Sequence, residues 1–256
     1  MKALKKEELR ALQARIHHLE RPKERSAGVL GLGIEALDEA LPDGGLAKAA
    51  VHEVTGSSAG GFAAMLAGKF CTAGKPVLWC VEAASKAALY GPGLAAFGVS
   101  PDRLIVVHCR TADEMLWAME EGLREEAVGL VIGEPVKPVS LTASRRLQLA
   151  AETGGTMGLI LCRGKTEGAL APSAVTTRWQ VDSMPSLGTG SVQGASRLSR
   201  SNTGWCLQLR RCRGAEQENF WDVEWDDAAC TLDLAANAGH RGMGSAAQSF
   251  LTSLAG

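Results

Sequence analysis

The chain has 256 residues, of which 46% are hydrophobic and 21% are charged. This composition is ordinary for a soluble globular protein, and the length allows one substantial hydrophobic core with a small appendage. The formal net charge of −1 argues against a surface that binds nucleic acid throughout. The sequence has neither an apolar run of about 18 residues nor a signal segment, which predicts a cytoplasmic protein.

Residues 1–27 are predicted to hold an amphipathic helix, over residues 2–21, and a polar connection to the core. The apolar positions of the helix recur three and four residues apart and are Leu9, Leu12, Ile16 and Leu19. An isolated helix of this length is marginal in water, so its apolar stripe needs a surface to cover it. We interpret these four residues as a candidate oligomer interface, with packing on the chain's own core as the alternative.

Residues 51–66 read VHEVTGSSAGGFAAML, which predicts an apolar strand, a Gly/Ser-rich turn and a helix. A nucleotide-binding loop at such a turn has the pattern G-x-x-x-x-G-K-[ST]. Phe62 and Ala63 stand where that pattern requires the lysine and the hydroxyl, so the terminal phosphates and Mg²⁺ lose their ligands. Backbone N–H groups of residues 57–61 could still face an anion. The sequence therefore predicts a degenerate nucleotide loop without a cofactor, made of Gly56, Ser57, Ser58, Gly60, Gly61, Phe62 and Ala63.

The segment that leads into this loop carries three further motifs. Residues 32–56 contain, in order, Leu-Asp-x-x-Leu, Gly-Gly-Leu and Glu-hydrophobic-x-Gly. This run resembles the RecA-type ATPase core, and the resemblance implies that Glu82 stands at the position of the catalytic glutamate. It also implies that Glu134 replaces the aspartate that ends the Walker B strand. A glutamate can reach a metal through water, but it has little to organise without the lysine and hydroxyl of the loop.

Between residues 28 and 184, short apolar segments alternate with helical stretches. The strands are expected at residues 51–55, 77–81, 104–109, 128–132, 157–162 and 175–181. Such strands predict an α/β fold, a RecA-like core with a mainly parallel sheet covered by helices. The degenerate loop would then lie at the carboxyl end of its strand, where open α/β sheets bind ligands. After the fifth strand, a short loop presents Arg163 and Lys165, either as a solvated turn or as a contact with DNA or an acidic partner.

Beyond the core, residues 185–204 are rich in Gly and Ser and are predicted to be a flexible linker. Residues 205–234 are predicted to form a β-hairpin, because apolar and polar residues alternate on both sides of a turn. Its apolar row is Trp205, Leu207, Leu209, Trp221, Val223 and Trp225. A lone hairpin is marginal in water, so this row must pack on the core or on a partner.

The tail, residues 235–256, is rich in Ala, Gly and Ser and is expected to be disordered. Its apolar end, at Phe250 and Leu251, can instead form a short docking helix on a partner. The seven cysteines include no C-x-x-C pair, and we expect most of them to be buried reduced thiols. No metal site is expected.

The hairpin motif WCLQLRRCRG at residues 205–214, together with the degenerate loop, resembles the ImuA family over about residues 28–234. These are RecA-like, SulA-related proteins of a bacterial mutagenesis cassette. The resemblance implies a noncatalytic accessory in SOS-induced translesion DNA synthesis, with an ImuB-like polymerase homologue and an error-prone polymerase. RecA and a second copy of the chain are further candidate partners. Trp205, Trp221, Trp225, Phe250 and Leu251 are the candidate partner-binding residues.

Two other functions stay open. A SulA-like cell-division inhibitor also needs no ATPase, although such proteins are usually shorter and lack a hairpin after a linker. A residual RecA-like ATPase is supported by Glu82 and Glu134. It is opposed by Phe62, which supplies no charge where catalysis is mostly electrostatic.

Overall fold

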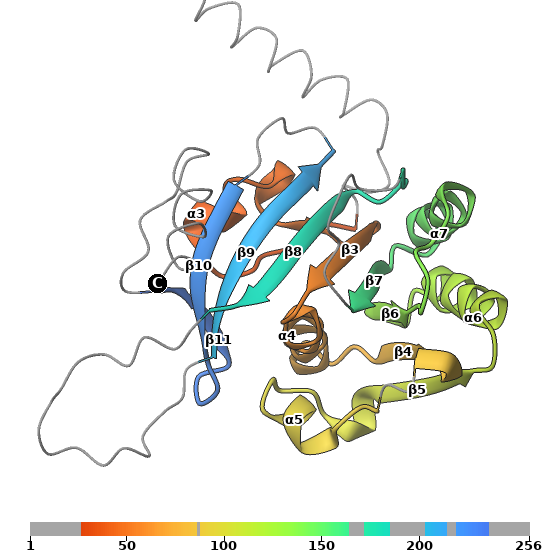
Figure 1. Cartoon of the computed structure of the whole chain (residues 1–256), viewed down its shortest axis with the longest axis horizontal. Helices are drawn as coiled ribbons and strands as arrows, with labels where there is room; N and C mark the ends of the chain where they lie inside the picture. Colours follow the sequence, from red (N-terminus) through yellow and green to blue (C-terminus); the bar gives the residue numbers. More distant parts are fainter. Residues whose placement is uncertain (1–26, 86–87, 164–171, 185–202, 214–218, 236–256) are drawn as a thin grey trace, which may run out of the picture.

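A computed structural model describes residues 27–85, 88–163, 172–184, 203–213 and 219–235. These residues form one nine-stranded sheet with helices on both faces, and a small two-stranded sheet beside it (Figure 1). The strand order is β11-β10-β9-β8-β3-β7-β6-β4-β5. The predicted α/β fold with a mainly parallel sheet is confirmed. The predicted leading helix, most of the linker and the tail lie outside the described residues.

Six strands of the large sheet run parallel to one another. They are β3 (Val51–Gly56), β4 (Val77–Glu82), β5 (Leu104–Cys109), β6 (Leu130–Glu134), β7 (Met157–Arg163) and β8 (Thr177–Ser183). Each one overlaps a strand expected from the sequence. Continuous apolar runs suit these strands because helices cover both of their faces.

The sheet continues beyond β8 through three antiparallel strands. These are β9 (Thr203–Cys212), β10 (Asn219–Asp226) and β11 (Thr231–Leu234), of which β11 was not predicted. The hairpin of β9 and β10 is therefore an extension of the main sheet, joined to it by the pairing of β8 with β9. The small sheet consists of β1 (Val29–Leu30) and β2 (Leu46–Ala47).

The described residues include the helices α3 (Glu35–Asp38), α4 (Ala59–Thr72), α5 (Gly91–Ala95), α6 (Ala112–Arg124) and α7 (Leu141–Gly154). The same part of the chain has short 3₁₀ turns at η1 (Pro42–Gly44), η2 (Ala83–Ser85) and η3 (Pro101–Arg103). Thr111 and Ser140 cap α6 and α7, since their hydroxyl oxygens accept backbone N–H bonds from Glu114 and Ala143. Gly155, with a φ of 71°, ends α7 in the left-handed conformation that glycine adopts without strain.

Two hydrophobic cores lie on opposite faces of the sheet. The larger core holds α4 together with the apolar row of β9 and β10, and the smaller core holds α6 and α7. α4 is buried along most of its length because it lies between the sheet and the α5 region. No helix among the described residues is long and apolar enough to span a bilayer.

Candidate functional site

The degenerate nucleotide loop lies at the carboxyl end of β3, as the sequence predicts, but it is very short. β3 ends at Gly56 and α4 begins at Ala59, so only Ser57 and Ser58 connect them. Gly60 and Gly61 already belong to the first turn of the helix. The backbone therefore does not form a wide cradle between the two glycine positions of the motif.

The N–H groups of this connection already have protein acceptors. Ser57 donates its backbone N–H to the Asp182 carboxylate over 2.8 Å, and its hydroxyl donates to the same oxygen over 3.0 Å. Ser58 donates its backbone N–H to the Val181 carbonyl over 3.0 Å. The end of β8 thus occupies the acceptor positions of these two N–H groups and adds a negative charge there, while the expectation for the N–H groups of residues 59–61 stays a prediction.

The end of β8 also explains why residue 56 is glycine. Gly56 has a φ of +107°, and a Cβ atom at this position would lie 2.2 Å from the Val181 carbonyl oxygen. The hydroxyls of Ser58 and Ser183 are 2.7 Å apart and add a second link between the loop and β8. The loop is thus fastened to its neighbouring strand by several short polar contacts.

Phe62, at the position of the missing lysine, is a core residue. Its side chain is fully buried, and its ring centroid lies 6.0 Å from that of Trp179 on β8. Ala63 is also fully buried. The side chains that would hold phosphate and Mg²⁺ in a nucleotide-binding loop are therefore replaced by side chains that fill the hydrophobic interior.

The tryptophans of the hairpin lie in the larger core, where Trp205 faces the start of α4 at Gly61. Trp205, Trp221 and Trp225 are only 1%, 3% and 1% exposed. The rings of Trp205 and Trp225 both contact Phe97, with centroids 6.0 and 5.2 Å away. Our interpretation of these tryptophans as partner-binding residues needs correction, because their apolar row faces the chain's own core and is covered there.

Glu82 and Glu134 lie at the same edge of the sheet as the loop, on adjacent strands. Val81 pairs with Glu134 between β4 and β6, so the two carboxyl-bearing residues are close in register. The Glu82 carboxylate accepts the Val136 backbone N–H over 3.0 Å, and Glu134 is 1% exposed. β7 separates β6 from β3, so the glutamates are not next to the loop. The described residues contain no group of three or more His, Cys, Asp or Glu side chains placed to hold a metal ion.

The remaining predicted site residues lie at or beyond the limits of the described chain. Arg163 ends β7 and pairs in register with Gly56, so its backbone is beside the loop. Lys165, the stripe of the leading helix and the apolar end of the tail lie outside the described residues. Their assigned roles stay predictions.

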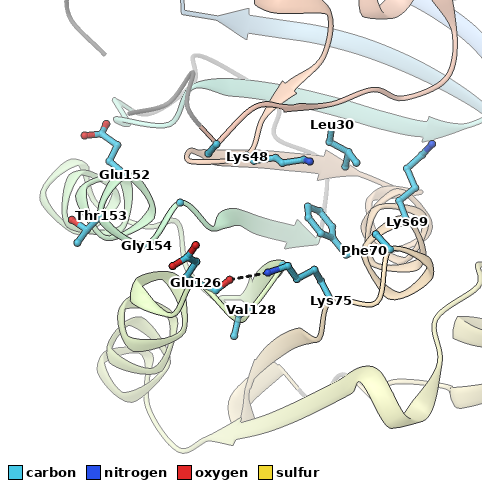
Figure 2. Close-up of a pocket in the computed structure, with 14 residues that line it drawn as sticks. Leu30, Lys48, Lys69, Phe70, Lys75, Glu126, Val128, Glu152, Thr153 and Gly154 are labelled. Atoms are coloured by element: carbon cyan, nitrogen blue, oxygen red, sulfur yellow. Dashed lines mark hydrogen bonds between the residues drawn. The ribbon is translucent and has the colours of Figure 1, made fainter. Parts of the chain in front are cut away.

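A separate concavity of about 620 Å³ lies at the opposite edge of the sheet (Figure 2). Lys48, Lys69 and Lys75 line it together with Glu126 and Glu152. Most of its lining residues precede β3, β4 and β6 or end α4 and α7, so it is at the amino ends of the parallel strands, with Leu30 of β1 beside it.

Sequence comparison places the chain among known proteins. Over 216 residues it is 32% identical to Protein ImuA of Caulobacter vibrioides strain NA1000 / CB15N, an alignment that covers 78% of this chain and 84% of the relative. The match to Protein ImuA of strain ATCC 19089 / CIP 103742 / CB 15 has the same identity and coverage. The chain belongs to the ImuA family. No family model matches it.

In this ImuA-family chain, Asp182, whose carboxylate closes the loop, was not among the site residues predicted from the sequence. A signal for it was present, since Asp182 directly follows the strand expected at residues 175–181, just as Glu82 follows the strand expected at residues 77–81. Nothing in the spacing indicated that the strand of Asp182 pairs directly with the strand of the loop, a neighbour relation that depends on sheet order.

Proposed function

We propose that this protein is a noncatalytic accessory of the ImuA–ImuB mutagenesis system. It acts in SOS-induced translesion DNA synthesis through protein contacts, with an ImuB-like polymerase homologue as its main partner and RecA or a second copy of itself as further partners. It does not hydrolyse nucleotides. Membership of the ImuA family supports the pathway in this proposal.

The closed loop is the observation that carries the noncatalytic part. The Asp182 carboxylate accepts both polar hydrogens of Ser57 and would repel a phosphate at this position. Phe62 supplies no positive charge to balance that repulsion, because its ring is part of the core. Phosphoryl transfer depends on positioned positive charge around the phosphates, so this geometry favours a role without turnover.

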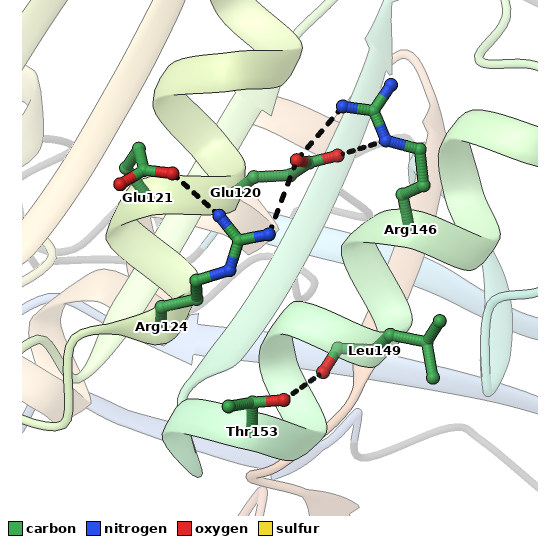
Figure 3. Close-up of polar contacts among 6 residues, drawn as sticks. All are labelled: Glu120, Glu121, Arg124, Arg146, Leu149 and Thr153. Atoms are coloured by element: carbon green, nitrogen blue, oxygen red, sulfur yellow. Dashed lines mark hydrogen bonds and ion pairs between the residues drawn. The ribbon is translucent and has the colours of Figure 1, made fainter.

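A partner must use surfaces other than the buried tryptophan row. Trp117 on α6 is 63% exposed and Leu149 on α7 is 55% exposed. Figure 3 shows the ion pair that joins these two helices, in which Arg146 of α7 binds Glu120 of α6 at 2.7 Å, while Arg124 binds Glu121 at 2.6 Å within α6. Because exposed tryptophans are enriched among the residues that dominate binding energy, Trp117 is a rational residue to mutate when the contact is mapped.

Capture of partners from damage-treated cells tests the proposal. The full-length chain carries an affinity tag, and bound proteins are identified by mass spectrometry with untreated cells as the control. We expect the ImuB-like polymerase homologue among the specific partners. A tubulin-like GTPase in its place would support a SulA-like inhibitor of cell division and contradict the accessory role.

A second set of captures locates the contact. Trp117→Ala is compared with Thr142→Ala, an exposed residue of α7 that serves as a matched surface control. Deletion of residues 237–256 is measured in the same assay. If Trp117→Ala or the deletion loses the polymerase homologue and Thr142→Ala retains it, the contact is assigned to α6 or to residues 237–256, respectively.

A further inference from the structure

Among the described residues, β5 forms one free edge of the nine-stranded sheet (Figure 1). It pairs with β4 along its six residues without a register shift. Its sequence, LIVVHC, contains no Pro, Lys, Arg, Asp or Glu. Sheet edges are normally protected by charge, proline, bulges or short length, because their unpaired N–H and C=O groups can bind another strand. The edge of β5 carries none of these protections.

The opposite edge of the sheet has a different character. β11 lies there, is only four residues long and carries the charged residue Asp233. Short length and charge are both typical of an edge that is protected against further pairing. Of the two edges, β5 is therefore the one that is suited to bind another strand.

Both faces of β5 present apolar side chains. Leu104 packs against the larger core and Val107 against the smaller core. Since successive side chains of a strand point to opposite faces, Val106 lies on the face of Leu104 and Ile105 on the face of Val107. Ile105 is 51% exposed and Val106 is 38% exposed. A strand that fits this edge is therefore apolar on both faces and uncharged at its centre, and β5 itself has this pattern.

The two ends of β5 carry exposed charges of opposite sign. Asp102 lies just before the strand with 74% of its side chain exposed, and Arg110 lies just after it with 86% exposed. Each has a neighbour of opposite charge in the chain, Arg103 for Asp102 and Glu114 for Arg110. Opposite charges in cross-strand positions stabilise a pair of strands, and like charges destabilise it. An antiparallel copy of β5 brings the acidic end of one strand to the basic end of the other.

We propose that two copies of this chain associate through antiparallel pairing of their β5 edges, which continues the sheet from one copy into the other. The two-fold axis passes between the two Val106 residues, so Ile105 of each copy lies opposite Val107 of the other. This register brings Asp102 of each copy toward Arg110 of the other at both ends of the interface. A register centred on a neighbouring residue would lose this pairing of charges. The interface is closed, because both copies use the same surface.

This inference deepens the self-association in the proposed function and rests on that part of it. The surface is distinct from the leading helix, for which a separate association is predicted. Contact along one strand edge is small, so we expect a weak dimer that forms in the micromolar range. The purified chain alone is measured, so a negative result is distinguishable from failure to capture the polymerase homologue.

Sedimentation velocity of the purified full-length chain over a range of concentrations tests the proposal. Val106→Glu places two negative charges opposite each other at the two-fold axis and should weaken dimerisation about tenfold or more. Asp102→Arg should also weaken it, and the exchange Asp102→Arg/Arg110→Asp should recover at least part of the lost affinity. Thr142→Glu, on the exposed surface of α7, should dimerise like the wild type.

Hydrogen exchange of the unmodified chain keeps the test valid if a variant does not fold. Exchange at residues 104–108 should slow as the concentration of the chain rises, because a second strand then binds the outward backbone groups of β5. The same measurement on Leu12→Glu/Ile16→Glu removes the association predicted for the leading helix, and the slowing should persist there.

Three results would overturn the proposal. They are dimerisation of Val106→Glu equal to that of the wild type, no recovery in the charge exchange, and hydrogen exchange at residues 104–108 that does not depend on concentration. Protection of these residues only when the polymerase homologue is added would assign the edge to that partner, and it would overturn the contact between copies as well.

Discussion

Replacing Phe62 with lysine, together with Ala63→Thr, restores the G-x-x-x-x-G-K-[ST] pattern of a nucleotide-binding loop. The double variant therefore tests whether the loop can still bind a nucleotide. Both native side chains are fully buried, and Phe62 packs on Trp179. Loss of a buried phenylalanine costs about 3–5 kcal/mol, and an ammonium forced into the core costs several kcal/mol more or loses its proton. Since domains have roughly 5–15 kcal/mol of total stability, we expect the double variant to be largely unfolded or severely destabilised.

Urea unfolding and titration with Mg-ATP check this expectation together. Phe62→Leu should lose roughly 1–2 kcal/mol, because most of the apolar volume stays, and Thr142→Lys should change stability by less than about 0.5 kcal/mol. The wild type should show no binding of Mg-ATP at micromolar concentration and no turnover. The prediction is refuted if the double variant keeps its stability within about 1 kcal/mol and binds Mg-ATP with a Kd below about 10 µM. Such a Kd corresponds to a binding free energy of about 7 kcal/mol.

Three further predictions concern assembly, partner capture and pH. Leu12→Glu with Ile16→Glu should dissociate oligomers in light scattering while the core stays folded; an unchanged mass would mean that the stripe packs on its own subunit. Deleting residues 237–256 should leave the thermal midpoint nearly unchanged, because a Gly- and Ala-rich tail buries little surface. The same deletion should weaken capture of the polymerase homologue. Equal capture by the deleted and full-length chains would mean that the core or the leading helix makes the contact. Burial lowers the pKa of His52 from 6.5 to about 4, so its contribution to stability is full above pH 6.5 and is lost as the pH falls toward 4. This pKa change corresponds to about 3 kcal/mol of unfolding free energy. Denaturant unfolding at pH 7 and pH 4 should therefore show that His52→Gln loses less stability at pH 4 than the wild type does. Equal losses of stability would contradict this prediction.

The sequence predicted the fold class and the six parallel strands because their signal is local. Each strand is an apolar run with a helical stretch before or after it, and hydrophobic patterning of this kind does not depend on strand order. The hairpin was also predicted from alternation, in that Trp205, Leu207 and Leu209 share one face. What the pattern left open was whether that face packs on the core or on a partner.

The candidate site was harder to predict because it depends on contacts between residues far apart in the chain. Asp182 and Ser57 are 125 positions apart, and they meet only because β8 pairs with β3. Trp205 reaches α4 only because β9 pairs with β8 beyond the linker. Sequence spacing indicates which side chains a loop carries, but it does not indicate which neighbouring strand fills the space above it.

The two glycines of the loop show why a motif can persist after its chemistry is lost. Gly56 is required because the Val181 carbonyl lies where a Cβ atom would be, and Gly61 faces the Trp205 ring, 2.9 Å from the position of a Cβ atom. Both constraints come from packing against β8 and β9, and neither needs a phosphate. Phe62 and Ala63 contribute to the same packing, since they fill the core under the helix. Glycines at these positions are therefore explained by the closed structure itself, and they are no argument for nucleotide binding in this chain.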